Sequence, residues 1–161
     1  MSWAETFRVL WRARRVTEPL ASVEGVTAGP RELVGSLQLR HVDAGSCNGC
    51  ELEIASAFGP VYDAERFGAR LVASPRHADG VLVTGPVTQN MVVPLVKTVE
   101  ATPRPRVVIA VGDCARDCGV FRGAYGVVGA VGDVVAVDVS IQGCPPDPTA
   151  IIEALRSIAR R

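Results

Sequence analysis

The five cysteines of this 161-residue sequence are the residues whose type and spacing point to chemistry. Cys47 and Cys50 form a CxxC pair between glycines in the stretch DAGSCNGCELEIA. Such a pair is typical of a redox dithiol, of half a zinc site, or of part of an iron–sulfur site. Cys114, Cys118 and Cys144 follow much later in the chain. The chemistry of the pair therefore depends on whether the fold brings later cysteines to it.

The elements around the cysteines alternate between strands and helices. We predict strands over 36–44, 69–74, 80–85, 106–112 and 132–140. We predict helices over 50–58, 90–101 and 147–161, the last with Asp147 as N-cap and Pro148 in its first turn. Several strands are near-continuous runs of Val, Ile and Leu, which is typical of parallel strands buried on both faces. The sequence therefore predicts an α/β fold with a mainly parallel sheet.

The first 34 residues stand apart from this alternation. Residues 2–15 predict an amphipathic helix. Four large apolar side chains share one of its faces: Trp3, Phe7, Leu10 and Trp11. Residues 17–35 are rich in Gly, Pro, Thr and Ser, as in an extended linker. We therefore divide the chain into an N-terminal helix and linker, 1–34, and an α/β domain, 35–161. The helix is expected to pack on its own domain or to dock on a partner or membrane surface.

Composition narrows the functional classes. Apolar residues make up 48% of the chain, enough for a core that needs no metal or disulfide to fold. Lys plus Arg equals Asp plus Glu, 17 each, which argues against nucleic acid as the main partner. No run approaches the ~20 apolar residues of a membrane span, and no secretory signal is visible. We therefore expect a cytosolic chain without a transmembrane segment of its own, whose cysteines stay reduced.

Four cysteines fall just after predicted strands, at the edge where open α/β sheets collect ligands. Cys47 and Cys50 follow the first strand, Cys114 the fourth and Cys144 the fifth. Four thiolates at one edge predict a site for zinc or for an iron–sulfur cluster. The isolated positions of Cys114 and Cys144 favour a cluster, because structural zinc sites usually combine two short paired motifs. A thioredoxin-type dithiol is disfavoured because it leaves both without a role.

Cys118 is left over, because a cubane cluster takes four protein thiolates. We interpret it as a small buried thiol near the site. The alternatives are exchange with Cys114 as a ligand, or a redox-sensitive thiol. His41 and His77 are interpreted as ordinary surface or core residues, since four cysteines already complete the site.

Four motifs, in order, resemble those of the small electron-transfer subunit shared by nickel–iron hydrogenases and respiratory complex I: GSCNGCELEI, VTGPVTQNM, AVGDCARDCGVF and IQGCPPDPTAIIEAL. The resemblance runs from about residue 35 to the C-terminus. It implies a flavodoxin-like three-layer fold carrying one 4Fe–4S cluster beside a catalytic large subunit. The implied ligands are Cys47, Cys50, Cys114 and Cys144, and Cys118 stands where the family often has glycine.

Spacing within the first motif separates two subgroups. The 20 kDa subunit of complex I typically has two adjacent cysteines there, whereas this chain has Cys47-Asn48-Gly49-Cys50. The stretch TGPVT also resembles the hydrogenase side, and the chain ends before any further cysteine-rich domain. It is thus similar to the small subunit of group 4, energy-converting hydrogenases. The resemblance implies a subunit of an oxidoreductase complex. It would relay electrons from a ferredoxin-like iron–sulfur subunit to a nickel–iron large subunit. That large subunit would reduce protons or oxidise hydrogen.

The same resemblance implies membrane subunits as further partners and a peripheral position on the cytoplasmic side of the membrane. Two alternatives stay open. One is a complex I-like NADH–quinone oxidoreductase subunit that passes electrons to quinone. The other, less favoured, is a zinc-stabilised interaction module.

Four residues beside the cysteines are candidates for tuning the site. Backbone amides of Gly49, Gly112 and Gly143 are predicted to point at cluster sulfurs and adjust the potential, with a simple turn role as the alternative for each. Glu53 lies three residues after Cys50 and so shares its helical face. We expect it near the cluster, in a subunit contact or in proton-coupled tuning, with a solvated position as the alternative. Glu51 is interpreted as solvated, and Asp113 as capping a loop amide.

Overall fold

The computed structural model describes residues 3–5, 8 and 35–159. The elements of the domain, where η marks a short 3-10 helix, are β1 (Leu37–Asp43), α2 (Gly49–Ala57), η1 (Ala64–Phe67), β2 (Ala69–Leu71), η2 (Pro75–His77), β3 (Gly80–Thr84), β4 (Val87–Thr88), α3 (Val92–Ala101), β5 (Val107–Val111), α4 (Asp113–Asp117), η3 (Gly119–Phe121), β6 (Val127–Gly129), η4 (Val131–Asp133), β7 (Val139–Ile141) and α5 (Pro148–Ala159). The predicted helix over 2–15 and linker over 17–35 lie almost wholly outside these residues. Residues 3–5 and 8 are helical.

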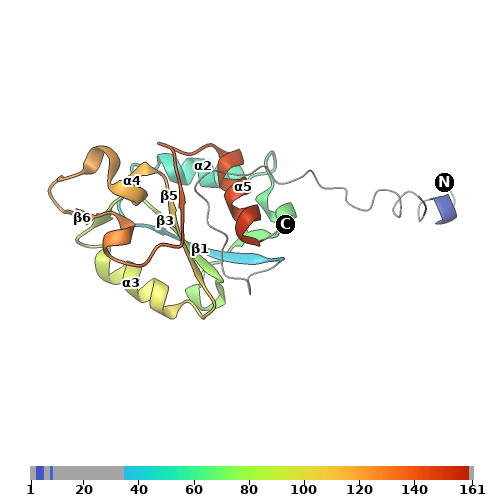
Figure 1. Ribbon diagram of the computed structural model, residues 1–161, viewed down its shortest axis with the longest axis horizontal. Coiled ribbons are helices and arrows are strands. Elements are labelled where there is room, and N and C mark those ends of the chain that lie inside the picture. The colour runs from blue at the N-terminus through green and yellow to red at the C-terminus, as the bar shows by residue number, and fades with distance from the viewer. Residues whose placement is uncertain (1–2, 6–7, 9–34, 160–161) are drawn as a thin grey trace.

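The central sheet has five strands in the order β2-β1-β3-β5-β7, and every neighbouring pair is parallel. Counted along the chain, this is the 2-1-3-4-5 order of flavodoxin-like folds. Every residue of β3 and of β5 is buried, as expected for central strands with helices on both faces. The predicted α/β fold with a mainly parallel sheet is therefore confirmed (Figure 1).

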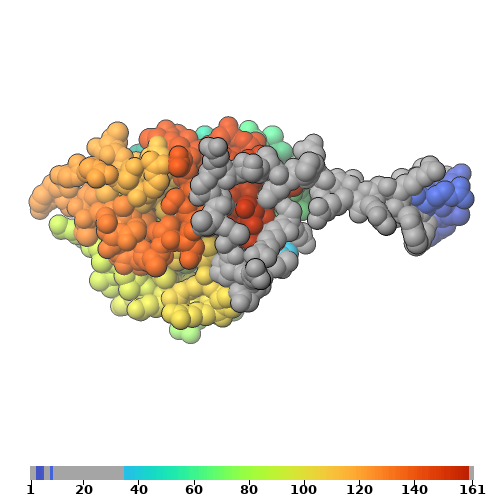
Figure 2. All heavy atoms as spheres, viewed as in Figure 1, coloured from blue at the N-terminus to red at the C-terminus, as the bar shows by residue number. Residues whose placement is uncertain are grey.

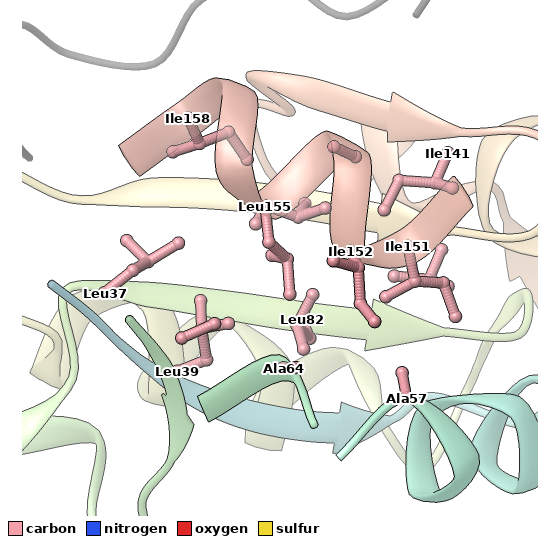
Figure 3. Packing of buried hydrophobic residues seen from close by; sticks show 14 of the residues in the cluster. Leu37, Leu39, Ala57, Ala64, Leu82, Ile141, Ile151, Ile152, Leu155 and Ile158 are labelled. Carbon is pink, nitrogen blue, oxygen red and sulfur yellow. The ribbon is translucent and has the colours of Figure 1, made fainter. Parts of the chain in front are cut away.

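Two apolar layers enclose the sheet, because alternate strand residues point to opposite faces. Along β5, Val107, Ile109 and Val111 belong to one cluster with α2 and α5, while Val108 and Ala110 belong to the other with α3 and α4. Figure 3 shows the first layer, in which Ile151, Ile152, Leu155 and Ile158 of α5 lie over Leu37, Leu39 and Leu82 of the sheet. Each such fully buried side chain contributes about 1.5–3 kcal/mol.

The carboxyl ends of four strands are in register. Asp43 of β1 pairs with Thr84 of β3, Thr84 with Val111 of β5, and Val111 with Ile141 of β7. The loops that follow these strands therefore leave the sheet side by side, along one edge. This alignment, rather than proximity in sequence, is what gathers the cysteine loops.

The strand predicted over 132–140 is wrong for most of its length. The chain forms η4 at Val131–Asp133 and enters the sheet only at Val139. Just before this strand, Asp138 bonds Val108 of β5 twice: its backbone N–H donates to the Val108 carbonyl at 2.9 Å, and its carboxylate Oδ2 accepts the Val108 N–H at 2.8 Å. The apolar residues before it cover the second layer instead of extending the strand: Val134, Val135 and Val137.

A second, two-stranded antiparallel sheet joins β4 to β6. The segment around β6 forms one end of the domain in the space-filling view (orange, Figure 2). Val120, Tyr125 and Val128 are exposed on it. Among the described residues, no helix combines the length and apolar character needed to cross a bilayer.

Candidate functional site

Four of the five cysteines line one small hollow at the carboxyl edge of the sheet. They are Cys47, Cys50, Cys114 and Cys144, and the hollow has a volume of about 50 Å³. Cys50 and Cys114 are buried, whereas Cys47 and Cys144 are exposed. Within the described part of the chain, no group of three or more His, Cys, Asp or Glu side chains is arranged to hold a single metal ion.

The first cysteine pair is positioned by the turn between β1 and α2. Asp43 Oδ1 accepts the N–H groups of Gly45 and Ser46, both at 2.8 Å, which turns the chain sharply after the strand. Asn48 then takes the left-handed conformation, φ +72°, as N-cap of α2. Cys50 consequently lies in the first turn of α2, with its side chain buried beside the sheet.

The second and third cysteine loops are joined by a reciprocal pair of hydrogen bonds. The N–H of Asp113 donates to the carbonyl of Gly143 at 2.9 Å, and the N–H of Gly143 donates to Asp113 Oδ1 at 3.1 Å. Asp113 precedes Cys114 and Gly143 precedes Cys144, so these two bonds hold the two cysteine loops against each other. Asp113 therefore caps a loop amide, as expected, but the amide belongs to the other cysteine loop.

These bonds correct the predicted role of two glycine amides. The N–H of Gly143 is taken by Asp113, and the N–H of Gly112 donates to the carbonyl of Ile141 at 2.8 Å. Neither is free to point at a sulfur. Gly49, at the start of α2, lines the hollow, and its amide stays a candidate.

Gly112 is needed for space rather than for its N–H group. Its φ is +90°, and a Cβ there would lie 2.6 Å from Cys50 Sγ. A Cβ on Gly49 would lie 3.6 Å from Cys47 Sγ. A side chain at position 112 would therefore collide with the Cys50 sulfur, whereas one at position 49 would be in ordinary contact with the Cys47 sulfur. Four thiols around one hollow fit the donor set of an iron–sulfur cluster.

The inner thiols are strongly perturbed by their surroundings. Burial raises the pKa of Cys50 to about 12, with smaller contributions from Glu51 and the other three cysteines of the hollow. Burial, and then Cys144 and Cys47, raise the pKa of Cys114. Burial and the neighbouring cysteines therefore favour the neutral thiol at Cys50 and at Cys114 in the metal-free chain.

Cys118 lies outside this group. It does not line the hollow, although it is buried and only four residues from Cys114. Burial raises the pKa of Cys118 as well, but the charged groups that act on it are Arg122, Asp133 and Asp117 rather than the other cysteines. Its φ of +69° at the end of α4 is a left-handed conformation that suits glycine better.

Of the two acidic residues on α2, the structure engages Glu51 rather than Glu53. Our interpretation of Glu51 as solvated is wrong: its carboxylate accepts the hydroxyls of Ser46 and Thr84 and lies 3.7 Å from His41 Nε2. Glu53 is half-buried, does not line the hollow, and makes no hydrogen bond or ion pair among the described residues. A role for Glu53 near the cluster stays a prediction.

This polar group escaped sequence reasoning because Thr84, which contacts both Glu51 and His41, lies 33 residues from Glu51 and 43 residues from His41 in the chain. One signal was present. Thr84 is the single polar side chain in the otherwise apolar strand GVLVT, and a fully buried hydroxyl requires a partner.

A family model described as "NADH ubiquinone oxidoreductase, 20 Kd subunit" matches residues 47–158. A probable membrane-bound hydrogenase subunit of Pyrococcus furiosus is 48% identical over 115 residues, which are 71% of this chain and 69% of that protein. Formate hydrogenlyase subunit 7 of Escherichia coli is 42% identical over 85% of this chain and 53% of its own length. The chain therefore spans about half of that second relative. An NADH-quinone oxidoreductase subunit of Bdellovibrio bacteriovorus is 39% identical over 69% of this chain and 59% of its own length.

Solved structures show the same architecture. A chain of the membrane-bound sulfane sulfur reductase, an archaeal respiratory membrane complex, superposes with a TM-score of 0.67 at 32% identity, covering 78% of this chain and 69% of that one. A chain of an NAD⁺-reducing [NiFe]-hydrogenase gives a TM-score of 0.57 at 19% identity, covering 73% of this chain and 87% of its own length. The second likeness concerns the fold alone.

Proposed function

Because this chain belongs to the family of the 20 kDa subunit of NADH ubiquinone oxidoreductase, whose relatives are subunits of oxidoreductase complexes, we propose that it relays electrons through one 4Fe–4S cluster held by Cys47, Cys50, Cys114 and Cys144. The family resemblance carried by the four sequence motifs is thereby confirmed. The cluster, its ligands and the direction of the relay are the proposal.

One observation carries it: four cysteines from three separate strand ends surround a single hollow, and the fifth does not. A cubane cluster requires four thiolates spread around its volume, whereas a dithiol redox centre would leave Cys114 and Cys144 unexplained. The glycines that keep Cβ atoms out of the hollow support the same interpretation.

A bound 4Fe–4S cluster supplies a one-electron carrier. The chain's own residues perform the remaining tasks. Asp113 joins two ligand loops, the first turn of α2 presents Cys50 from within the core, and the apolar layer around Ile54 excludes water from that sulfur. Cys47 and Cys144 are exposed, which leaves one side of the site open for a partner subunit to cover.

We propose a hydrogenase-like, nickel–iron large subunit as the electron acceptor or donor on that side, and a ferredoxin-like subunit as the other redox partner. The support is the Cys47-Asn48-Gly49-Cys50 spacing together with the identity to the Pyrococcus hydrogenase subunit. We place the chain peripherally on the cytoplasmic side of a membrane complex. A quinone-reducing, complex I-like assembly is the second candidate, favoured by the match to the Bdellovibrio NADH-quinone oxidoreductase.

The test of the cluster is anaerobic purification of the full chain. We expect a brown protein with about four irons per chain and an EPR signal of a reduced 4Fe–4S cluster. Cys144→Ala should lose the cluster. A colourless chain that binds stoichiometric zinc would contradict the proposal and support the zinc-stabilised module.

The test of the partner is purification of the native complex through a tag on this chain. A hydrogenase partner predicts nickel in the complex and reduction of protons to hydrogen, with a reduced viologen dye as the electron donor. Quinone reduction by a nickel-free complex would establish the complex I-like alternative instead.

A further inference from the structure

A half-buried polar group lies directly beside the proposed cluster site, on the side of β1 and β3. It consists of Glu51, Ser46, Thr84 and His41, and we call it the Glu51 group. Ser46 Oγ donates to Glu51 Oε2 at 2.6 Å, and Thr84 Oγ1 donates to Glu51 Oε1. The Glu51 side chain is 16% exposed, and Thr84 is fully buried.

Each member of the group comes from a different part of the site. Ser46 immediately precedes the first cysteine, Glu51 immediately follows the second, and Thr84 ends the central strand β3. Ser46 Oγ also accepts the N–H of Asn48 at 3.1 Å, inside the CxxC segment. The carboxylate of Glu51 therefore connects both ends of the CxxC segment to the rigid core of the sheet.

His41 completes the group from β1. Its Nε2 lies 3.0 Å from Thr84 Oγ1. Since the Thr84 hydroxyl donates its hydrogen to Glu51, its oxygen accepts from His41, and we assign the Nε2–H tautomer on that basis. With this tautomer, His41 donates to Thr84 while Thr84 donates to Glu51.

The other two ligand loops are held in a different way. The loops of Cys114 and Cys144 are bound to each other through Asp113 and Gly143. The loop after β1 instead lies in close contact with the loop after β3, since a Cβ on Gly85 would collide with the backbone N of Ser46. The Glu51 group is a polar connection across that contact.

We propose that Glu51 is a positioning residue, which, through Ser46 and Thr84, holds Cys47 and Cys50 at the separation and orientation that the cluster requires. The inference rests on the proposed cluster site. A hydrogen bond to a carboxylate is among the stronger polar interactions in proteins, and leaving the buried Thr84 hydroxyl without its acceptor adds a further cost. Loss of Glu51 therefore loosens the CxxC segment without altering a ligand.

The first experiment measures amide hydrogen exchange in the full-length chain, purified anaerobically. We expect Glu51→Ala to speed exchange of residues 44–50 about tenfold, with Glu51→Gln in between, because an amide oxygen replaces only one of the two acceptors. Thr84→Val keeps the shape of the side chain, packs in the same strand, and should reproduce part of the effect. Exchange in β5 should stay as in the unmodified chain.

Glu53→Gln is the matched comparison, because Glu53 lies on the same helix without a hydrogen-bond partner among the described residues. It should leave exchange of residues 44–50 as it is in the unmodified chain. Unchanged exchange in Glu51→Ala, or an equal effect of Glu53→Gln, would overturn the proposal.

The second experiment separates positioning from simple support of the fold. In Glu51→Gln that retains its iron, we expect a changed EPR line shape and a shifted midpoint potential, and faster cluster loss under air. An unchanged spectrum and potential, with only a lower melting temperature, would show that Glu51 supports the fold alone and would overturn the proposal. If the unmodified chain binds no iron, the proposed function fails, whereas the exchange experiment still decides whether Glu51 holds the CxxC segment.

Discussion

Gly112 offers the sharpest test of how the proposed cluster site is built. It lies between β5 and Cys114, with φ +90° and ψ +161°, a backbone conformation that is essentially restricted to glycine. A Cβ at this position would lie 2.6 Å from Cys50 Sγ. We therefore expect Gly112→Ala to act on the chain twice, through backbone strain and through displacement of a ligand sulfur.

The two effects differ in size and in consequence. The backbone strain costs of order 1–3 kcal/mol, which lowers the melting temperature by about 3–12 °C in a domain of this size. The steric effect is local: the new Cβ would lie 2.6 Å from Cys50 Sγ, about 0.8 Å closer than the 3.4 Å at which ordinary van der Waals contact begins. Metal–ligand distances tolerate about 0.2 Å, so a sulfur moved by most of that overlap no longer fits a cluster.

The assay is iron content and EPR after anaerobic purification, together with thermal melting of the metal-free chain. Gly126→Ala is the control, because Gly126 also has a positive φ, +82°, but a Cβ there meets nothing within 4 Å. We expect both variants to melt at lower temperature and only Gly112→Ala to lose iron. Four irons and an unchanged EPR signal in Gly112→Ala would refute the reasoning.

Three further outcomes are expected. Cys118→Gly should retain the cluster, because Cys118 lies outside the hollow and its φ of +69° suits glycine. Cys144→Ala should lose the cluster, and equal loss of iron in both variants would disprove the ligand assignment. Asp113→Ala should remove the carboxylate bond between the Cys114 and Cys144 loops and keep the backbone one, seen as faster amide exchange at Gly143, and unchanged exchange there would count against the carboxylate bond. In the metal-free chain, the pKa of Cys50 is raised from 9.0 to about 12, so between these pH values the folded state keeps a proton that the unfolded state has released. The free energy of unfolding measured in urea should therefore stay level below pH 9.0 and fall as the pH rises from 9.0 towards about 12. A rise over that range would contradict the burial of this thiol.

The positions of the four cysteines could be predicted because they depend on simple periodicity. Runs such as VVIAV are recognisable as buried parallel strands, and parallel strands place their carboxyl ends at one edge. A cysteine immediately after such a run is therefore near that edge. The same reasoning left out Cys118, which the structure also places outside the hollow.

The strand over 132–140 was mispredicted for a related reason. The stretch GDVVAVDVS has the composition of a strand, but composition does not show which residues find a partner strand. Asp138 bonds Val108 of β5 with both its backbone N–H and its carboxylate, and the paired strand itself covers only Val139–Ile141. The preceding valines instead pack against one face of the sheet, and valine suits that position as well as it suits a strand.

The alternation of strands and helices, the sheet edge that receives the cysteines, and the family could all be read from the amino-acid order. They follow from patterns that are local along the chain, or from motifs that can be compared directly. What holds the site together became visible only in three dimensions. Glu51 and Glu53 look alike on the helix, and Gly112 and Gly143 look alike as flanking glycines, yet their bonds to Thr84, Ile141 and Asp113 distinguish them. Hydrogen bonds between loops depend on strand order and register, which bring together residues that are distant in the sequence.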